Sequence, residues 1–347
     1  MFSLGALRDR GPTLWRYREA LGIEREDCIV SLGEGSTPLT SARLNGLQVM
    51  LKVDYLCPTG SYKDRGSTVM ISKLKEWGIR EIIEDSSGNA GASIAAYSAV
   101  AGIRAEIYVP SSTSAGKAAQ IEMYGADLVR VSGSREKTTD AAFEAAQRIF
   151  YASHNWSPYF LVGMKTAAYE IAEQLDWDVP EWVVTPAGGG SLLAGLYLGF
   201  LDLFRAGYIQ AVPRLAAVQS SACAPIYRAW SAGLNDIPEG TKGPTAAEGI
   251  SVARPVRQNL ILESIRQSNG LVYTVGDDDV WKMVEVLGRQ GIYVEPTAAA
   301  APAAIQQLQA SGAIRQNDRV AVLLTGSGLK ATDKIVEHYA NREVLQA

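Results

Sequence analysis

Residues 72–110 read SKLKEWGIREIIEDSSGNAGASIAAYSAVAGIRAEIYVP, and this stretch decides the predicted fold. It predicts an exposed helix, a strand at Glu81–Glu84, a loop of glycine and serine, an alanine-rich helix and a second strand at Ala105–Val109. Two strands joined through a helix lie parallel, because the helix has to cross over the sheet between them. The stretch therefore predicts an α/β fold with a parallel sheet.

The flanking sequence repeats this alternation. LQVMLKV at 47–53 predicts a strand, a helix is expected to begin near Asp64, and TTDAAFEAAQRIF at 138–150 predicts another helix. Three further runs in the second half each predict a strand: EWVVTP at 181–186, RLAAVQS at 214–220 and DRVAVLL at 318–324. A chain of 347 residues is also longer than one hydrophobic core usually supports.

We therefore expect an α/β protein of two domains, each an open, twisted, mostly parallel sheet flanked by helices. The smaller domain is predicted at 45–155, and the larger one at 1–44 plus 156–347. Ligands of such sheets bind beyond the carboxyl ends of the strands, so a binding cleft is expected between the two domains.

The composition excludes several classes of function. Hydrophobic residues make up 47% of the chain, charged residues 20%, and the net charge is −4, so neither nucleic acid nor a membrane is an expected partner. Cys28, Cys57 and Cys223 lie far apart without the spacing of a zinc site, and no metal is expected. Charged residues occur within the first ten positions, which argues against a hydrophobic leader and predicts a cytoplasmic protein.

Three loops follow predicted strands and carry residues suited to chemistry: DSSGNAG at 85–91, TPAGGGS at 185–191 and LTGSG at 324–328. In the second loop Gly188, Gly189 and Gly190 precede an apolar helix, so backbone N–H groups and the helix N-terminus could bind a phosphate. A tight turn that needs glycine only for its backbone angles is the alternative. The loop lacks the spacing of the ATP and NAD fingerprints.

The loop at 85–91 could bind a carboxylate. Ser86, Ser87 and Asn89 offer hydroxyl and amide groups at the start of a helix, where the helix dipole favours an anion. An ordinary N-cap with local hydrogen bonds explains the same residues equally well.

Lys63, in SYKDRGS at 61–67, suggests that the two loops bind parts of the same ligands. A lone lysine is most often a solvated surface charge, but a desolvated lysine amine can attack an aldehyde and form a Schiff base. A phosphate loop, a carboxylate loop and a reactive lysine together suit pyridoxal 5′-phosphate and an amino-acid substrate.

Several motifs resemble, in order and spacing, those of the fold-type II pyridoxal-phosphate enzymes, and among them most closely the threonine synthase family. They are GEGSTPL at 33–39, SYKDRGS at 61–67, SSGNAG at 86–91, PAGGGS at 186–191, EPTAAAA at 295–301 and LLTGSGLK at 323–330. The resemblance extends over nearly the whole chain. It implies a lyase that forms threonine and phosphate from O-phosphohomoserine and water, and a homodimer.

The resemblance also implies roles for individual residues. Lys63 would carry the cofactor and move protons, Asn89 would bind the cofactor's 3′-oxygen, and Thr325 would face the pyridine nitrogen. Residues that would hold the cofactor phosphate are Ala187, Gly188, Gly189, Gly190 and Ser191, and those that would hold the substrate carboxylate are Ser86, Ser87, Gly88 and Asn89. Glu295 and Thr297 are expected only to begin a helix.

The chain departs from the threonine synthase pattern in several places, among them the loop PAGGGSLLAGL, which is closer to that of serine and threonine dehydratases, and Ser327 in place of a frequent histidine. A further departure bears on the substrate. Tyr159 and Phe160 stand near the place of an arginine that normally helps to hold the substrate phosphate, and Lys117 or Lys165 is a candidate replacement. A serine or threonine dehydratase, or a β-replacement enzyme on a serine derivative, is therefore an alternative. A catalytically silent protein that binds pyridoxal phosphate is another.

Overall fold

The computed structural model describes residues 1–113, 115–133 and 135–346. Within them the chain forms two sheets, a six-stranded one in the order β1-β2-β10-β7-β8-β9 and a four-stranded one in the order β5-β4-β3-β6. All neighbouring strands are parallel except β1 and β2, which form an antiparallel hairpin. The prediction of an α/β fold with mostly parallel sheets is confirmed.

The strands are β1 (Leu39–Leu44), β2 (Leu47–Lys52), β3 (Glu81–Glu84), β4 (Arg104–Pro110), β5 (Asp127–Val131), β6 (Phe150–Tyr151), β7 (Trp182–Pro186), β8 (Arg214–Ser220), β9 (Leu271–Val275) and β10 (Val320–Leu323). The helices of the smaller sheet and its surroundings are α1 (Lys63–Glu76), α2 (Asn89–Ala101), α3 (Ala115–Met123) and α4 (Arg135–Ala145).

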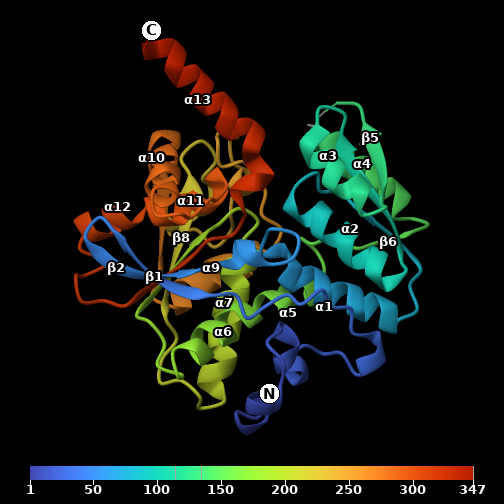
Figure 1. Cartoon of the computed structure of the whole chain (residues 1–347), viewed down its shortest axis with the longest axis horizontal. Coiled ribbons are helices and arrows are strands. Elements are labelled where there is room, and N and C mark those ends of the chain that lie inside the picture. The colour runs from blue at the N-terminus through green and yellow to red at the C-terminus, as the bar shows by residue number, and fades with distance from the viewer. Residues whose placement is uncertain (114, 134, 347) are drawn as a thin grey trace.

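The later helices are α5 (Pro158–Met164), α6 (Thr166–Gln174), α7 (Ser191–Arg205), α8 (Pro225–Ser231), α9 (Gln258–Gln267), α10 (Asp277–Gly288), α11 (Pro296–Ala303), α12 (Ile305–Ala310) and α13 (Thr332–Gln346). Figure 1 shows the smaller sheet and α2 to α4 on one side of the molecule, with α13 extending away from the body at the top. No helix in these described ranges is long and apolar enough to cross a membrane.

Both faces of the six-stranded sheet are covered, which explains its apolar strands. In the central strand β7, Val183 packs into the core beneath α7, whereas Trp182 and Val184 pack into the core beneath α11. Buried parallel strands are apolar at successive positions for this reason, and the strand EWVVTP is recognisable in the sequence because of it.

At two places the structure differs in detail from the sequence predictions, because sheet pairing is non-local. The strand at 47–53, expected to open the smaller domain, is β2, and it pairs with β1 and β10 in the larger sheet. The helix expected at 138–150 ends at Ala145, because Phe150 pairs with Ile82 as part of β6. The smaller sheet therefore begins after β2, and the domain bounds of 45–155 stay a prediction.

A buried ion network joins α1 to the larger sheet. The Arg65 guanidinium donates to Asp54 at 2.8 Å and to Glu170 at 2.7 Å, and Lys52 Nζ donates to Glu170 at 2.7 Å. Burial alone would raise the pKa of Glu170, but the charges of Arg65 and Lys52 hold this pKa well below its usual value. Two cations and two anions balance here, which offsets the cost of taking them out of water.

Helices α1 and α5 pack almost backbone to backbone. A Cβ atom added at Gly163 would lie 1.9 Å from the Arg65 carbonyl oxygen, so any side chain at this position would push the two helices apart. The close approach fixes the first turns of α1, where Lys63 lies.

Gly163→Ala is expected to lower the free energy of unfolding by about 1–3 kcal/mol, because the added methyl group overpacks the α1–α5 contact. Gly288→Ala, at a helical position with no atom within 4 Å of the added Cβ, is the matched control and should change stability by less than about 1 kcal/mol. Urea unfolding of both variants measures the difference. Equal unfolding midpoints for the two variants would contradict the packing described here.

Candidate active site

Lys63 lies at the junction between a loop and α1, directly beside the loop that follows β10. Tyr62 N donates to Thr325 O at 3.0 Å, and Ser61 forms a β-bridge with Gly326. Lys63 Nζ lies 4.6 Å from the centre of the Tyr62 ring. Within the described ranges its amine has neither a hydrogen bond nor an ion pair, so it is not committed to a structural contact.

Glu295 connects the start of α2 to the loop that follows β10. Asn89 Nδ2 donates to the two carboxylate oxygens of Glu295 at 3.1 and 3.2 Å, and Glu295 N donates to Gly326 O at 3.1 Å. An added Cβ at Gly326 would lie 2.3 Å from Glu295 Oε1, so glycine is required for this approach. Lys63, Thr325 and Asn89, predicted from three separate motifs, therefore lie in one neighbourhood.

The glycine loop between β7 and α7 is shaped by two close contacts. Gly190 has a φ of +76°, which favours glycine, and an added Cβ there would lie 2.4 Å from Ile261 of α9. An added Cβ at Gly188 would lie 2.8 Å from Ile250 Cα. The N–H groups of Gly188, Gly189 and Gly190 have no hydrogen-bond partner in the part of the chain that the structure describes, so they form a cradle of free donors before α7.

The residues on either side of the glycine loop, and those in the turn before α2, were also predicted to bind ligands. Ala187 is fixed by a hydrogen bond from its N–H to Val218 O at 2.8 Å, and Ser191 is buried at the first position of α7. Ser86, Ser87 and Gly88 are half-buried in the turn before α2, where Gly88 N donates to Ser86 Oγ at 3.3 Å.

A cofactor that carries a pyridine ring and a phosphate fits these residues. Among the described residues, the buried Thr325 Oγ1 has no hydrogen-bond partner, and neither have the three glycine N–H groups. A buried polar group without a partner costs free energy, so unsatisfied donors of this kind indicate a bound group.

Asp64, the neighbour of Lys63, has a structural task. Its carboxylate accepts hydrogen bonds from Thr59 N at 2.7 Å and from Ser93 Oγ at 2.6 Å. Burial raises the pKa of Asp64 to about 6 in spite of these bonds. The residue therefore holds the loop before α1 against α2.

The loop at 153–157 contributes to the site, and the sequence did not predict it. An added Cβ at Gly189 would lie 3.2 Å from Asn155 Oδ1, so this side chain lies against the glycine loop. Glu295 also lies at the site, although the sequence predicts for this residue only the start of a helix. Its signal was a single acidic residue directly before an apolar, alanine-rich helix.

Three positions are candidates for binding the phosphate of a substrate: the place of Phe160, Lys165 and Lys117. Phe160 is fully buried in the core, so the place of the expected arginine is apolar. Lys165 Nζ is bound to Asp202 at 2.5 Å, and the side chain of Lys117 lies outside the described residues.

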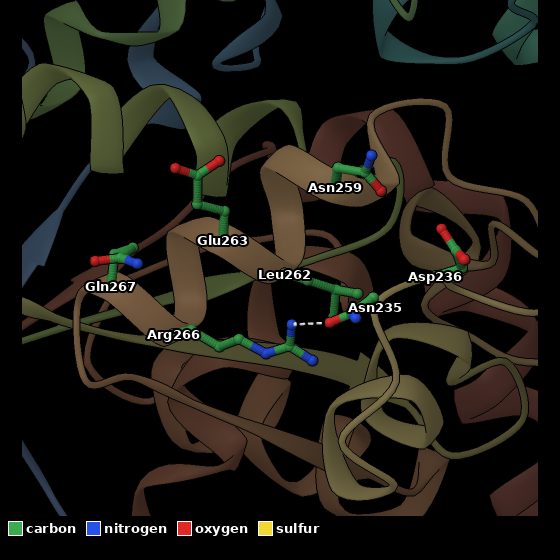
Figure 2. Close-up of a pocket in the computed structure, with 7 residues that line it drawn as sticks. All are labelled: Asn235, Asp236, Asn259, Leu262, Glu263, Arg266 and Gln267. Atoms are coloured by element: carbon green, nitrogen blue, oxygen red, sulfur yellow. Dashed lines mark hydrogen bonds between the residues drawn. The ribbon is translucent and has the colours of Figure 1, made fainter.

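A surface hollow near α9 is separate from this site. Figure 2 shows its lining, with Arg266 donating to Asn235 Oδ1 at 3.0 Å. The other lining residues are Asp236, Asn259, Leu262, Glu263 and Gln267. None of them belongs to the loops described above, whereas Ile261 of the same helix faces Gly190.

Comparison with known proteins identifies relatives over nearly the whole chain. Residues 30–326 match the family described as "Pyridoxal-phosphate dependent enzyme". A threonine synthase from Methanocaldococcus jannaschii is 34% identical over 340 residues, which cover 95% of this chain and 84% of that protein. A threonine synthase from Methanosarcina acetivorans is 32% identical over 339 residues, which cover 95% and 83%.

Solved structures agree in fold. A threonine deaminase from T.th. superposes with a TM-score of 0.70 at 26% identity, over 84% of this chain and 92% of that one. Maize serine racemase superposes with a TM-score of 0.74 over 90% of this chain and 94% of that one. At 20% identity the second likeness concerns the fold alone.

Thr325→Val is expected to stabilise the cofactor-free protein by about 1 kcal/mol, because valine has the shape of threonine without the unpaired hydroxyl. In the cofactor-loaded protein the gain should disappear or reverse, since the hydroxyl then has a partner. Thermal unfolding of both forms of both proteins measures the difference. An equal gain with and without cofactor would show that Thr325 does not contact it.

Proposed function

The chain belongs to the family of pyridoxal-phosphate dependent enzymes, and we propose that it is a threonine synthase, which forms threonine and phosphate from O-phosphohomoserine and water. The observation that carries the proposal is that the loops of Lys63, Thr325 and Asn89 are joined by hydrogen bonds. The glycine loop 188–190 follows β7, which lies parallel to and beside β10, the strand that leads to Thr325. The identity of 34% with a threonine synthase over 95% of the chain supports the choice of reaction.

Each part of the cofactor has a proposed protein partner. Lys63 Nζ would hold it covalently, Thr325 Oγ1 would contact the pyridine nitrogen and Asn89 Nδ2 the 3′-oxygen. The phosphate would lie on the N–H groups between Ala187 and Ser191, where the N-terminus of α7 favours an anion. When bound, the cofactor supplies an electron sink for the pair left at the substrate's α carbon.

The remaining chemistry falls to the protein. Ser86, Ser87, Gly88 and Asn89 would hold the substrate carboxylate at the start of α2 and so orient the α carbon. The Lys63 amine would take the α proton and return protons as phosphate leaves the γ carbon and water adds at the β carbon. The Tyr62 and Phe160 rings, whose centres lie 4.6 and 5.9 Å from Nζ, flank the amine and limit the directions from which a ligand can approach it.

The organisation of the protein belongs to the proposal too. We place the cofactor between two domains built on the two sheets, with the smaller one starting after β2. The free cysteines Cys28, Cys57 and Cys223 suit a reducing cytoplasm. A homodimer is also part of the proposal, and Leu329 and Val336, which are 77% and 61% exposed near and on α13, are candidates for its contact surface.

A serine or threonine dehydratase is the second candidate. The buried Phe160, in place of a cation, favours it, because a dehydratase substrate carries no phosphate. Purified protein incubated with O-phosphohomoserine should release phosphate and form threonine. Formation of a 2-oxo acid from threonine or serine, without turnover of O-phosphohomoserine, would favour the dehydratase.

Lys63→Ala is expected to abolish the absorbance band near the visible edge that borohydride removes, and to lower threonine formation at least about 1000-fold, because the covalent link and the proton carrier are both lost. Lys242→Ala, at an exposed lysine, is the matched control and should keep both. Retention of the band and the activity by Lys63→Ala would overturn the assignment.

A further inference from the structure

Arg257, which directly precedes α9, reaches across to the loop that follows β6. Its Nη2 atom donates to Ser157 O at 2.7 Å, and its Nη1 atom donates to Asn155 O. Strand β6 lies next to β3 in the smaller sheet and runs parallel to it. Arg257 therefore comes from a segment packed on the larger sheet and binds a loop at the carboxyl edge of the smaller one.

Some N–H donors of the Arg257 guanidinium group have no hydrogen-bond partner among the described residues. Arginine carries five N–H donors, and the two hydrogen bonds to carbonyl oxygens leave three of them without a partner among the described residues. In the same ranges no carboxylate pairs with Arg257, although the side chain is half-buried. Burial lowers the pKa of Arg257 below its usual value, and no acidic neighbour offsets this.

A half-buried cation without an anionic partner is costly, and two other cations that are largely shielded from water have carboxylate partners here. Lys165 is bound to Asp202, and Arg65 is bound to two carboxylates. The arrangement at Arg257 therefore indicates an anion that is absent from the protein chain itself.

The position of Arg257 indicates that the anion it could bind belongs to the substrate. Asn155, whose carbonyl accepts from Arg257, turns its side chain toward Gly189 of the glycine loop. The loop at 153–157 and the loop at 86–89 follow neighbouring strands and leave the smaller sheet at the same edge. The guanidinium thus lies on the side of the glycine loop where the substrate carboxylate is proposed to bind.

We propose that Arg257 binds the phosphate ester of the substrate and is a specificity-determining residue of this enzyme. This inference rests on the proposed function, since that reaction requires a substrate with a second anionic group. The cofactor phosphate has its own donors in the glycine loop and at the start of α7. The planar fork of arginine suits a phosphate dianion, which can accept two parallel hydrogen bonds.

Arg257→Met in the cofactor-loaded protein tests the proposal. We expect the KM for O-phosphohomoserine, and the Kd of inorganic phosphate measured by calorimetry, to rise about 10- to 100-fold, because a charge-assisted pair of hydrogen bonds is lost. Arg257→Lys keeps the charge and a donor for the carbonyl oxygens, so its losses should be smaller. The Kd of the cofactor and the melting temperature of Arg257→Lys should match the unchanged protein.

Arg254→Met is the matched control. Arg254 lies on the same segment with a side chain that is 71% exposed and pairs with Glu239, so its removal should leave both constants unchanged. Three results would overturn the proposal: unchanged phosphate affinity in Arg257→Met, weakened cofactor binding by the same factor as phosphate binding, or no phosphate binding by the unchanged loaded protein.

Different results would refute the proposed reaction and the proposed role of Arg257. Threonine formation by the unchanged protein, together with unaltered constants in Arg257→Met, would remove the role of Arg257 and leave the reaction standing. Absence of threonine formation, together with phosphate binding that Arg257→Met loses, would remove the reaction and leave Arg257 as an anion-binding residue for a substrate of another kind.

Discussion

The buried ion pairs of Arg65 are the interaction on which the rest of the structure depends. Arg65 lies two positions after Lys63, and its guanidinium holds Asp54, beyond the end of β2, and Glu170 of α6. Lys52 of β2 supplies the second cation. Because all these side chains are nearly inaccessible to water, loss of any one of them leaves a buried charge unpaired. The network therefore fixes the start of α1 against the larger sheet, and with it the direction in which Lys63 points.

The loops around Lys63 contribute groups that the protein itself does not satisfy. The Thr325 hydroxyl and the glycine N–H groups lack partners in the described chain, whereas the Arg65 network is fully paired. Folding thus satisfies the polar groups that hold the site together and leaves unpaired those that face the proposed ligands. Such preorganised donors need little rearrangement when an anion binds, which makes them effective in binding and catalysis.

The sequence predicted the features that depend on local pattern. Strand β3, the alanine-rich helix α2 and the central strand β7 follow from runs of apolar residues bounded by glycine and serine. The place of β2 did not follow, because its partner β10 lies far along the chain, and nothing near residue 50 specifies that pairing. Motifs brought Lys63, Asn89 and Thr325 to attention, but Glu295, Asn155 and Arg257 reach the site only through tertiary contacts. Their roles, like those of the predicted site residues, remain predictions.

Identification of the lysine that carries the cofactor tests the central claim most directly. The loaded protein is reduced with borohydride, digested with a protease, and analysed by mass spectrometry for the peptide that has gained the reduced cofactor. The account predicts that the modification lies on Lys63. A modification on another lysine, or none on a protein that binds the cofactor, would contradict it.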